Sequence, residues 1–271
     1  MAESPARADC TELDGHAALV VGGTRGIGLA ICEALCLRGA RVITCGTSAE
    51  GIANVAAIAS ARQWPMEAVQ ADIRSERDID ALVTHAAKQM GHLSALVFCA
   101  GRAWRGDAGE TSIEDWDDCL ALNLRAPFIA AKFALPHLQK AQSPSIVFIS
   151  SIWAVTATRR RVAYSVAKAG LTALTRNLAI DYGHCGIRVN AVAPGYIETD
   201  LLRQSIAQVA QGRDLLPEIE ARHPLRRIGK PRDIGEMVAF LVGAGGQFVT
   251  GQTILVDGGV TAKFALADHW E

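Results

Sequence analysis

The sequence predicts an α/β fold in which one doubly wound domain surrounds a seven-stranded parallel sheet. From Ala17 onward, short apolar runs rich in β-branched residues alternate with longer helical stretches, which is the pattern of βαβ units. The runs lack a strict alternation of apolar and polar residues, as expected for strands covered by helices on both faces. With 271 residues, of which 50% are hydrophobic, the chain can bury one large core.

The strands are expected to follow one another along the chain with a helical stretch between them. Their predicted ranges are 17–22, 41–45, 66–71, 94–99, 145–150, 187–192 and 252–256. Residues 1–14 are polar and lack the apolar segment of a signal peptide, so we expect a loose tail before a domain over 15–271. Residues 198–231 break this rhythm with a long polar stretch interrupted by Gly and Pro, which predicts a mobile substrate lid.

Composition narrows the classes of function. The formal charge of −1 and the lack of a Lys/Arg-rich run argue against a nucleic-acid-binding protein. The seven cysteines show no CxxC pair or Cys/His cluster, so we expect no metal site, and reduced thiols in a cytoplasmic protein. No run of about 18 apolar residues occurs, so a membrane span is not expected.

A glycine-rich turn, VGGTRGIG, follows the first predicted strand and precedes a helix. Its glycines are spaced so that the turn is tight, the backbone can approach a pyrophosphate, and the helix packs close to the strand. Free N–H groups at the start of that helix favour an anion. Such a turn alone is often an ordinary loop, but its place after the first strand predicts a Rossmann-type dinucleotide site. The expected contacts are Gly22, Thr24, Arg25, Gly26, Ile27 and Gly28.

Two later turns are expected at the same edge of the sheet. Asp72, with Ile73 beside it, follows the third strand, where its carboxylate could accept a hydrogen bond from an adenine amino group. A helix N-cap is the alternative role for Asp72. Cys99, Ala100 and Gly101 close the fourth strand, where small residues let the backbone lie against a cofactor. A plain turn is the alternative there.

A tyrosine and a lysine indicate candidate catalytic chemistry. Tyr164 and Lys168 lie four residues apart in a helical segment, so both side chains project from one face. An ammonium near a phenol favours the phenolate, so Lys168 is expected to lower the pKa of Tyr164 from about 10 toward the working pH. Tyr164 would then donate a proton in reduction and accept one in oxidation. Ser151 ends the fifth strand and is expected to hydrogen-bond the substrate oxygen, with Ser150 as its competitor.

Together these features resemble the short-chain dehydrogenase/reductase family over residues 13–259. The family's serine lies thirteen residues before its tyrosine, which selects Ser151, and its YxxxK motif matches Tyr164 and Lys168. The resemblance implies that Asn123, in LALNLRAPF, is the catalytic asparagine. In the family this residue holds a water that links the lysine to a proton relay.

The resemblance also implies cofactor contacts after the sixth strand, where PGYIET is similar to the segment that binds the nicotinamide carboxamide through a threonine hydroxyl. The contacts implied there are Pro194, Gly195, Ile197 and Thr199. The catalytic residues Asn123, Tyr164 and Lys168 are expected to touch the cofactor too. Cys99 replaces the asparagine of the family's NAG motif, which puts a local hydrogen bond in doubt.

The implied function is transfer of a hydride between a nicotinamide cofactor and a small ketone or secondary alcohol. The C-terminal stretch resembles the 3-oxoacyl-carrier-protein reductase branch, which serves many substrates, so the substrate is not named. A nucleotide sensor without catalysis, and a dehydratase or epimerase on the same scaffold, are the alternatives. Relatives pair through the helices that carry Asn123 and Tyr164, so we expect a homotetramer with residues 250–267 as a further subunit contact.

Two local features bear on specificity. Gly46 stands where an acidic residue would bind the ribose 2′-OH of NAD(H), while Arg25 and Thr47 offer donors to a 2′-phosphate. NADP(H) is therefore favoured, and NAD(H) stays possible. The cluster Arg159–Arg161 lies between Ser151 and Tyr164, where an arginine could clamp a carboxylate or phosphate, although a solvated loop is the alternative.

Overall fold

The protein, represented by a computed structural model, is described over residues 12–210 and 213–262. Its sheet has seven parallel strands in the order β3-β2-β1-β4-β5-β6-β7. The strands are β1 (Ala17–Val21), β2 (Arg41–Gly46), β3 (Met66–Gln70), β4 (Ala95–Phe98), β5 (Ser145–Ile149), β6 (Arg188–Pro194) and β7 (Thr253–Val256). Every predicted strand is confirmed, with each end within two residues. The strand order reverses between β1 and β4, which places a ligand crevice beyond their carboxyl ends.

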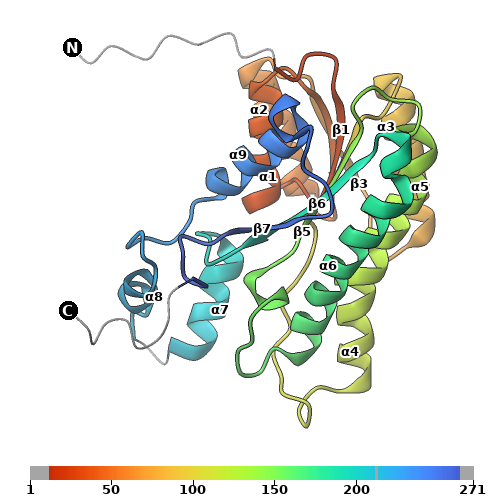
Figure 1. Cartoon of the computed structure of the whole chain (residues 1–271). Coiled ribbons are helices and arrows are strands. Elements are labelled where there is room, and N and C mark those ends of the chain that lie inside the picture. The colour runs from red at the N-terminus through yellow and green to blue at the C-terminus, as the bar shows by residue number, and fades with distance from the viewer. Residues whose placement is uncertain (1–11, 211–212, 263–271) are drawn as a thin grey trace, which may run out of the picture.

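Two layers of helices cover the sheet (Figure 1). One face carries α1 (Gly26–Leu37), α2 (Ala49–Arg62) and α9 (Pro231–Val242). The other carries α3 (Glu76–Met90), α5 (Ala126–Leu138) and α6 (Val162–Tyr182). Each layer packs against one side of the strands and forms its own buried cluster, because neighbouring strand residues point to opposite faces. The central strands β1, β4 and β5 are therefore buried along their whole length, as their unbroken apolar runs predict.

One residue of the predicted tail, Leu13, packs into the domain. Leu13 is fully buried in the core on the α1 side, and its amide donates to the Arg38 carbonyl at 2.8 Å. Leu13 therefore belongs to the domain, and including it in a loose tail was wrong. Leu13 stands alone among polar residues, so the sequence has no apolar periodicity that would predict its burial. The remainder of the predicted tail, residues 1–11, lies outside the described residues.

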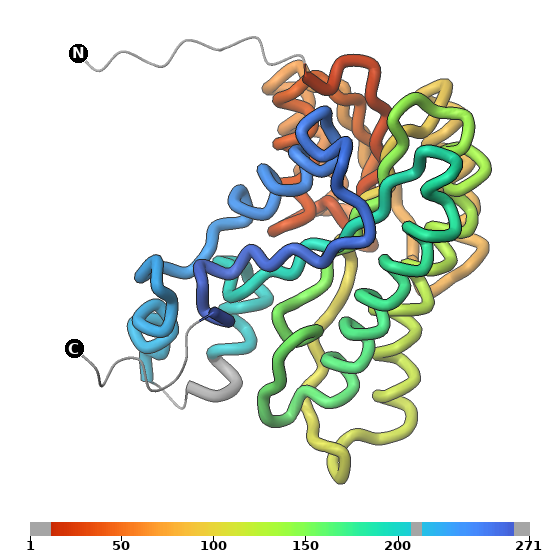
Figure 2. The backbone as a smooth tube through the Cα atoms, in the orientation of Figure 1, coloured from red at the N-terminus to blue at the C-terminus, as the bar shows by residue number. Residues whose placement is uncertain are grey.

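The expected lid segment contains two helices, α7 (Asp200–Ala210) and α8 (Leu216–Arg222). Its two ends are held together, because the Glu198 amide donates to the Gly229 carbonyl and the Gly229 amide to the Tyr196 carbonyl, both at 2.8 Å. In Figure 2 these helices lie to one side of the sheet and away from the helix layers. Closure of this segment over a substrate stays a prediction.

The helix from Ile113 to Leu138 is continuous but changes its winding in the middle. It consists of α4 (Ile113–Leu120), one π-helical turn (Ala121–Arg125) and α5. By length and composition alone it could cross a membrane, although half of its most apolar window is buried in the fold. One side of this helix packs into the core, which explains its apolar residues there, and its other side is an exposed face.

Candidate active site

The glycine-rich turn packs backbone against backbone. Gly22 has φ +86°, and a Cβ there would lie 2.7 Å from Ala100, so glycine alone fits. A Cβ at Gly28 would lie 2.0 Å from the Gly22 carbonyl oxygen. The turn therefore leads into α1 at Gly26 with no side chain from these glycines over the first amides of the helix. Such amides, which lack partners within the helix, can bind a phosphate.

The ends of β4 and β6 lie around this turn. Cys99 and Ala100 both donate their amides to the Val21 carbonyl at 2.9 Å, which holds the β4 end beside the turn. Thr199 lies opposite the start of α1, since a Cβ at Gly26 would be 3.5 Å from Thr199 Cγ2. The Thr199 hydroxyl accepts from the Leu202 amide at 3.2 Å and so begins α7. The structure thus brings together three segments that the sequence places far apart.

Some of the other expected cofactor contacts are packed against neighbouring residues, and others are exposed. Pro194 ends β6, and Gly195 is constrained because a Cβ there would lie 2.8 Å from the Asp257 backbone. Ile73 and Ile197 are buried, at 8% and 5% exposure, and their contact with a cofactor stays a prediction. Thr24 lies against Gly46, where a Cβ would be 2.6 Å from the Thr24 hydroxyl. The side chains of Arg25 and Thr47 are exposed.

Asp72 is not a helix N-cap. Its carboxylate pairs with Arg74, at 2.7 Å between Asp72 Oδ2 and Arg74 Nη2, and hydrogen bonds from Arg74 lower its pKa. The N-cap of α3 is Ser75, whose hydroxyl accepts the Asp78 amide. The alternative role considered for Asp72 is therefore excluded, and contact with an adenine stays a prediction.

Asn123 occupies the π-helical turn and is fully buried. Its amide nitrogen donates to the carbonyls of Arg102 and Cys119, each at 3.1 Å. Its Oδ1 has no partner among the described residues and faces Gly101, where a Cβ would approach it to 2.7 Å. Single π turns in helices are common at functional sites, and this one aims an unpaired acceptor at the end of β4. Lys168 Nζ would lie 3.6 Å from the same Cβ position, so lysine and asparagine share this space.

Tyr164, Lys168 and Ser151 come together at the carboxyl end of β5. Lys168 donates from Nζ to the Ile149 carbonyl at 2.9 Å, and the same atom lies 5.7 Å from the centroid of the Tyr164 ring. Ser151 interacts with the Tyr164 hydroxyl strongly enough to lower the pKa of the phenol. Ser150 instead directs its hydroxyl to the Lys168 carbonyl at 3.2 Å. The structure therefore places Ser151, and not its neighbour, beside the tyrosine.

The pKa of Tyr164 differs from expectation. Burial raises it to about 12, and only part of the rise is opposed by Ser151 and the charge of Arg161. Burial also lowers the pKa of Lys168 to about 8. The expectation that Lys168 lowers the pKa of Tyr164 toward neutral is therefore wrong for this structure. Desolvation of the phenol dominates, and the cation that acts on it is Arg161.

The three arginines before α6 have different surroundings. Arg159 is exposed, and Arg160 pairs with Glu110 at 2.7 Å. Arg161 is partly buried and donates from Nη1 to the Trp104 carbonyl at 3.1 Å. The solvated-loop interpretation therefore describes the first two arginines and not the third. Sequence reasoning treated the cluster as one unit and left Trp104 out of the site.

A second group that sequence reasoning missed begins next to Ser151, whose hydroxyl accepts from the Trp153 amide at 3.2 Å. The rings of Trp153 and Tyr196 meet edge to face at 6.4 Å, and those of Tyr196 and His223 at 5.8 Å. His223 is 1% exposed, and its Nε2 has no partner among residues 12–210 and 213–262. The spacing of these residues along the chain carried no signal of this contact.

These features fit a nicotinamide dinucleotide. The glycine turn offers a cradle that a Cβ would fill, and Asn123 Oδ1 is a buried acceptor that lacks a protein partner in the described part of the chain. Thr199 closes the opposite side of the turn. No group of three or more metal-binding side chains lies together within the described ranges.

Comparisons with known proteins find relatives over nearly the whole chain. Residues 21–261 match the family described as Enoyl-(Acyl carrier protein) reductase. The chain is 36% identical to 2-(S)-hydroxypropyl-CoM dehydrogenase 3 of Xanthobacter autotrophicus, covering 90% of this chain and 95% of the relative. It is 37% identical to cis-4-hydroxycyclohexanecarboxylate dehydrogenase of Sinomonas cyclohexanicum, covering 90% and 96%.

Solved structures show the same fold. Aldohexose dehydrogenase of Thermoplasma acidophilum has a TM-score of 0.86 at 30% identity, covering 95% of this chain and 98% of that one. A variant of actinorhodin polyketide ketoreductase, solved with NADPH, has a TM-score of 0.87 at 31% identity, covering 92% and 98%. These relatives are named as dehydrogenases and reductases, which supports an oxidoreductase and neither a sensor nor a dehydratase or epimerase.

Proposed function

Since this chain belongs to the short-chain dehydrogenase/reductase family and is an NAD(P)(H)-dependent oxidoreductase of ketones or secondary alcohols, we propose that Tyr164 transfers the proton of the reaction. The observation that carries the proposal is the convergence of Ser151, Tyr164 and Lys168 beside the glycine turn. The bound nicotinamide supplies or accepts the hydride. Tyr164 donates its phenolic proton to the carbonyl oxygen in reduction and takes it back in oxidation.

The neighbouring side chains support that transfer. Ser151 donates a hydrogen bond to the same substrate oxygen and orients it toward Tyr164. Lys168 has a pKa of about 8 and therefore gains and loses a proton near neutral pH. It returns a proton to Tyr164 after the phenol has given its own to the substrate. Asn123 holds through its unpaired Oδ1 a water that connects Lys168 to solvent. The high pKa of Tyr164 keeps the phenol protonated at neutral pH, which suits reduction.

The cofactor is held along the carboxyl edge of the sheet. The start of α1 would hold the pyrophosphate, the ends of β2 and β3 the adenosine, and the ends of β4 and β6 the nicotinamide. The residues proposed to hold it are Gly22, Thr24, Arg25, Gly26, Ile27, Gly28, Thr47, Asp72, Ile73, Cys99, Ala100, Gly101, Asn123, Tyr164, Lys168, Pro194, Gly195, Ile197 and Thr199.

We propose NADP(H) as the preferred cofactor. Gly46 provides no acid to repel a 2′-phosphate, and the exposed Arg25 and Thr47 offer donors to it. Arg25→Ala should narrow the preference for NADPH over NADH by about 10- to 100-fold in kcat/KM, the range of a charge-assisted hydrogen bond. A wild-type enzyme that prefers NADH would contradict this choice.

Turnover by Tyr164→Phe tests the central role. This variant deletes one hydroxyl and little contact area. Its turnover should therefore fall below about a tenth of the wild-type value, while its Kd for NADPH should stay close to that of the wild type. The assay follows NADPH absorbance with a panel of cyclic and linear ketones, beginning with 4-oxocyclohexanecarboxylate because one relative is named for the corresponding alcohol. Retention of more than a tenth of the turnover would overturn the assignment.

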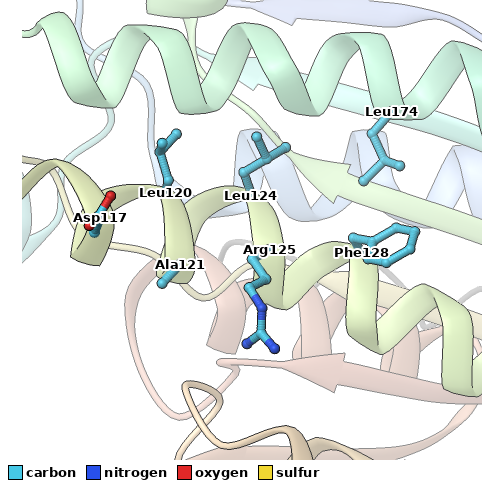
Figure 3. A pocket seen from close by; sticks show the side chains of 7 residues that line it. All are labelled: Asp117, Leu120, Ala121, Leu124, Arg125, Phe128 and Leu174. Atoms are coloured by element: carbon cyan, nitrogen blue, oxygen red, sulfur yellow. The ribbon is translucent and has the colours of Figure 1, made fainter.

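We also propose a homotetramer in the cytoplasm. The exposed face of α4, α5 and α6 holds an apolar hollow of about 440 Å³. Leu124 and Leu174 project into the space between the helices from opposite sides, while Arg125 points away (Figure 3). Phe128 at its edge is 47% exposed. A second copy would cover this apolar surface around a two-fold axis. A measured mass of one chain in light scattering at micromolar concentration would refute the proposal.

A second subunit contact is proposed at β7, the edge strand of the sheet. Its residues are only partly covered, with Leu255 at 42% exposure. An uncovered edge strand with apolar side chains favours pairing with another chain. The rest of the segment expected to make this contact, from residue 263 onward, lies outside the described residues.

A further inference from the structure

Arg161 lies immediately before the helix that carries the proposed catalytic residues. It is the N-cap of α6, three residues before Tyr164 and seven before Lys168. Its backbone is not helical, with φ −139° and ψ 24°, so its direction is set by the preceding loop and not by the helix face that Tyr164 and Lys168 share. Arg161 and Tyr164 affect each other electrostatically, since the guanidinium lowers the pKa of Tyr164. The guanidinium therefore lies close enough to the reacting hydroxyl to act on it.

The backbone directs Arg161 inward and its neighbour outward. Arg160 has φ +62°, a left-handed conformation that costs a non-glycine residue about 1–2 kcal/mol. On one side of this turn Arg160 reaches Glu110, and on the other Arg161 reaches the Trp104 carbonyl. A parallel bridge between Gly106 and Arg161 fixes the two loops side by side.

The surroundings of the Arg161 guanidinium disfavour its positive charge. Burial lowers the pKa of Arg161, and the nearby charge of Arg105 lowers it further. Neither arginine has an ion pair within residues 12–210 and 213–262. Arg161 uses one N–H on the Trp104 carbonyl, which leaves donors of its planar fork to be satisfied. A bound anion would stabilise the charged forms of two neighbouring arginines that have no carboxylate partner.

Trp104, whose carbonyl accepts from Arg161, also carries an unused donor. It packs against the apolar cluster that Tyr164 also contacts, and Arg102 lies over its ring at 4.1 Å. Its Nε1 is buried and has no acceptor among the described residues. Leaving such a donor unpaired costs free energy unless a ligand or water accepts from it.

From this arrangement we propose that the substrate carries an oxyanion, such as a carboxylate, which Arg161 and Trp104 Nε1 bind while its ketone or alcohol meets Tyr164. The inference rests on the proposed function, because it names the substrate class of that site. Arg105, which is exposed, attracts the anion toward the entrance.

Other roles of Arg161 predict different behaviour. Arg25, and not Arg161, lies at the glycine turn where a cofactor phosphate is expected. A purely structural role, through the tie to the Trp104 carbonyl, would weaken all substrates alike. The distinguishing quantity is therefore the preference for an acid over its neutral ester, measured at one pH.

The kinetic test uses three ketones, 4-oxopentanoate, 3-oxocyclohexanecarboxylate and 4-oxocyclohexanecarboxylate, each beside its methyl ester. The wild type should favour the acid of at least one pair, and Arg161→Gln should lower the acid-to-ester ratio of kcat/KM by about 10- to 100-fold. Arg161→Lys, which retains a charge without the planar fork, should recover part of the ratio. Arg159→Gln is the matched control from the exposed part of the same loop and should keep the ratio within about twofold.

A labelling test needs no turnover. Phenylglyoxal modifies arginines in the NADPH-loaded enzyme, and mass spectrometry of the loop peptide follows Arg159 and Arg161 separately. At least one of the three acids should slow modification of Arg161 and leave Arg159 unchanged, while its ester protects neither. Absence of protection by all three acids, or equal protection of both arginines, would overturn the anion site.

The outcomes separate the two proposals. Equal turnover of acids and esters, with a ratio that Arg161→Gln does not change, overturns the anion site and leaves the role of Tyr164 intact. Retention of more than a tenth of the turnover in Tyr164→Phe overturns the proposed catalytic role, and the labelling result still decides whether Arg161 binds an anion.

Discussion

Gly28→Ala is expected to weaken cofactor binding and, by a smaller amount, the stability of the fold. In a helix, alanine is favoured over glycine by about 0.5–1 kcal/mol. Here the new Cβ would lie 2.0 Å from the Gly22 carbonyl oxygen and 2.9 Å from the Gly23 Cα. These are backbone atoms that cannot rotate away, so the glycine turn must move, at a cost of about 1–3 kcal/mol for overpacking. The free energy of unfolding should therefore fall by only about 0–2.5 kcal/mol.

The displaced turn should have its main effect on the phosphate contacts. Loss of one charge-assisted hydrogen bond to the pyrophosphate costs about 1.5–3 kcal/mol, so the Kd for NADPH should rise about 10- to 150-fold. Isothermal titration calorimetry measures this Kd, and urea denaturation measures the free energy of unfolding.

Gly91→Ala is the matched control for this experiment. Gly91 ends α3 with φ +75° and has nothing within 4 Å of a new Cβ. Alanine there should cost about 1–2 kcal/mol of stability through its left-handed backbone and leave the Kd for NADPH unchanged. If Gly28→Ala bound NADPH as tightly as the wild type, or Gly91→Ala lost affinity to the same extent, the packing argument for the turn would be refuted.

Three further outcomes follow from single side chains. Lys168→Ala should nearly abolish turnover and also raise the Kd for NADPH, since the family resemblance implies that its ammonium holds the nicotinamide ribose; unchanged affinity in calorimetry would contradict that second role. Arg161→Gln removes a cation that lowers the pKa of Tyr164, so that pKa rises. Oxidation needs the phenolate, so the rising limb of its kcat/KM profile should shift to higher pH. A shift to lower pH would exclude this electrostatic effect. Arg188→Met should lower the free energy of unfolding by about 3–5 kcal/mol in urea, because the buried guanidinium donates to three carbonyls at and after the end of α9; a loss below about 1 kcal/mol would show that water replaces it.

Local patterns in the sequence determined the strands, the glycine turn and the identity of the catalytic candidates. Apolar β-branched runs bounded by turns can form only a few structures, so the predicted strands agree with the observed ones. The helical spacing of Tyr164 and Lys168 fixes which face they share before any tertiary contact is known. Ser151 was selected by its distance from Tyr164, and the strand geometry sends Ser150 the other way.

Tertiary structure decided the surroundings of those residues, and with them their chemistry. The pKa of Tyr164 depends on how deeply the phenol is buried and on which cation is nearest, and neither quantity is contained in a spacing of four residues. The inward direction of Arg161 depends on the left-handed turn at Arg160 and on a carbonyl that lies 57 residues earlier in the chain. Desolvation and long-range contacts are properties of the packed molecule, because they are set by atoms that only folding brings together.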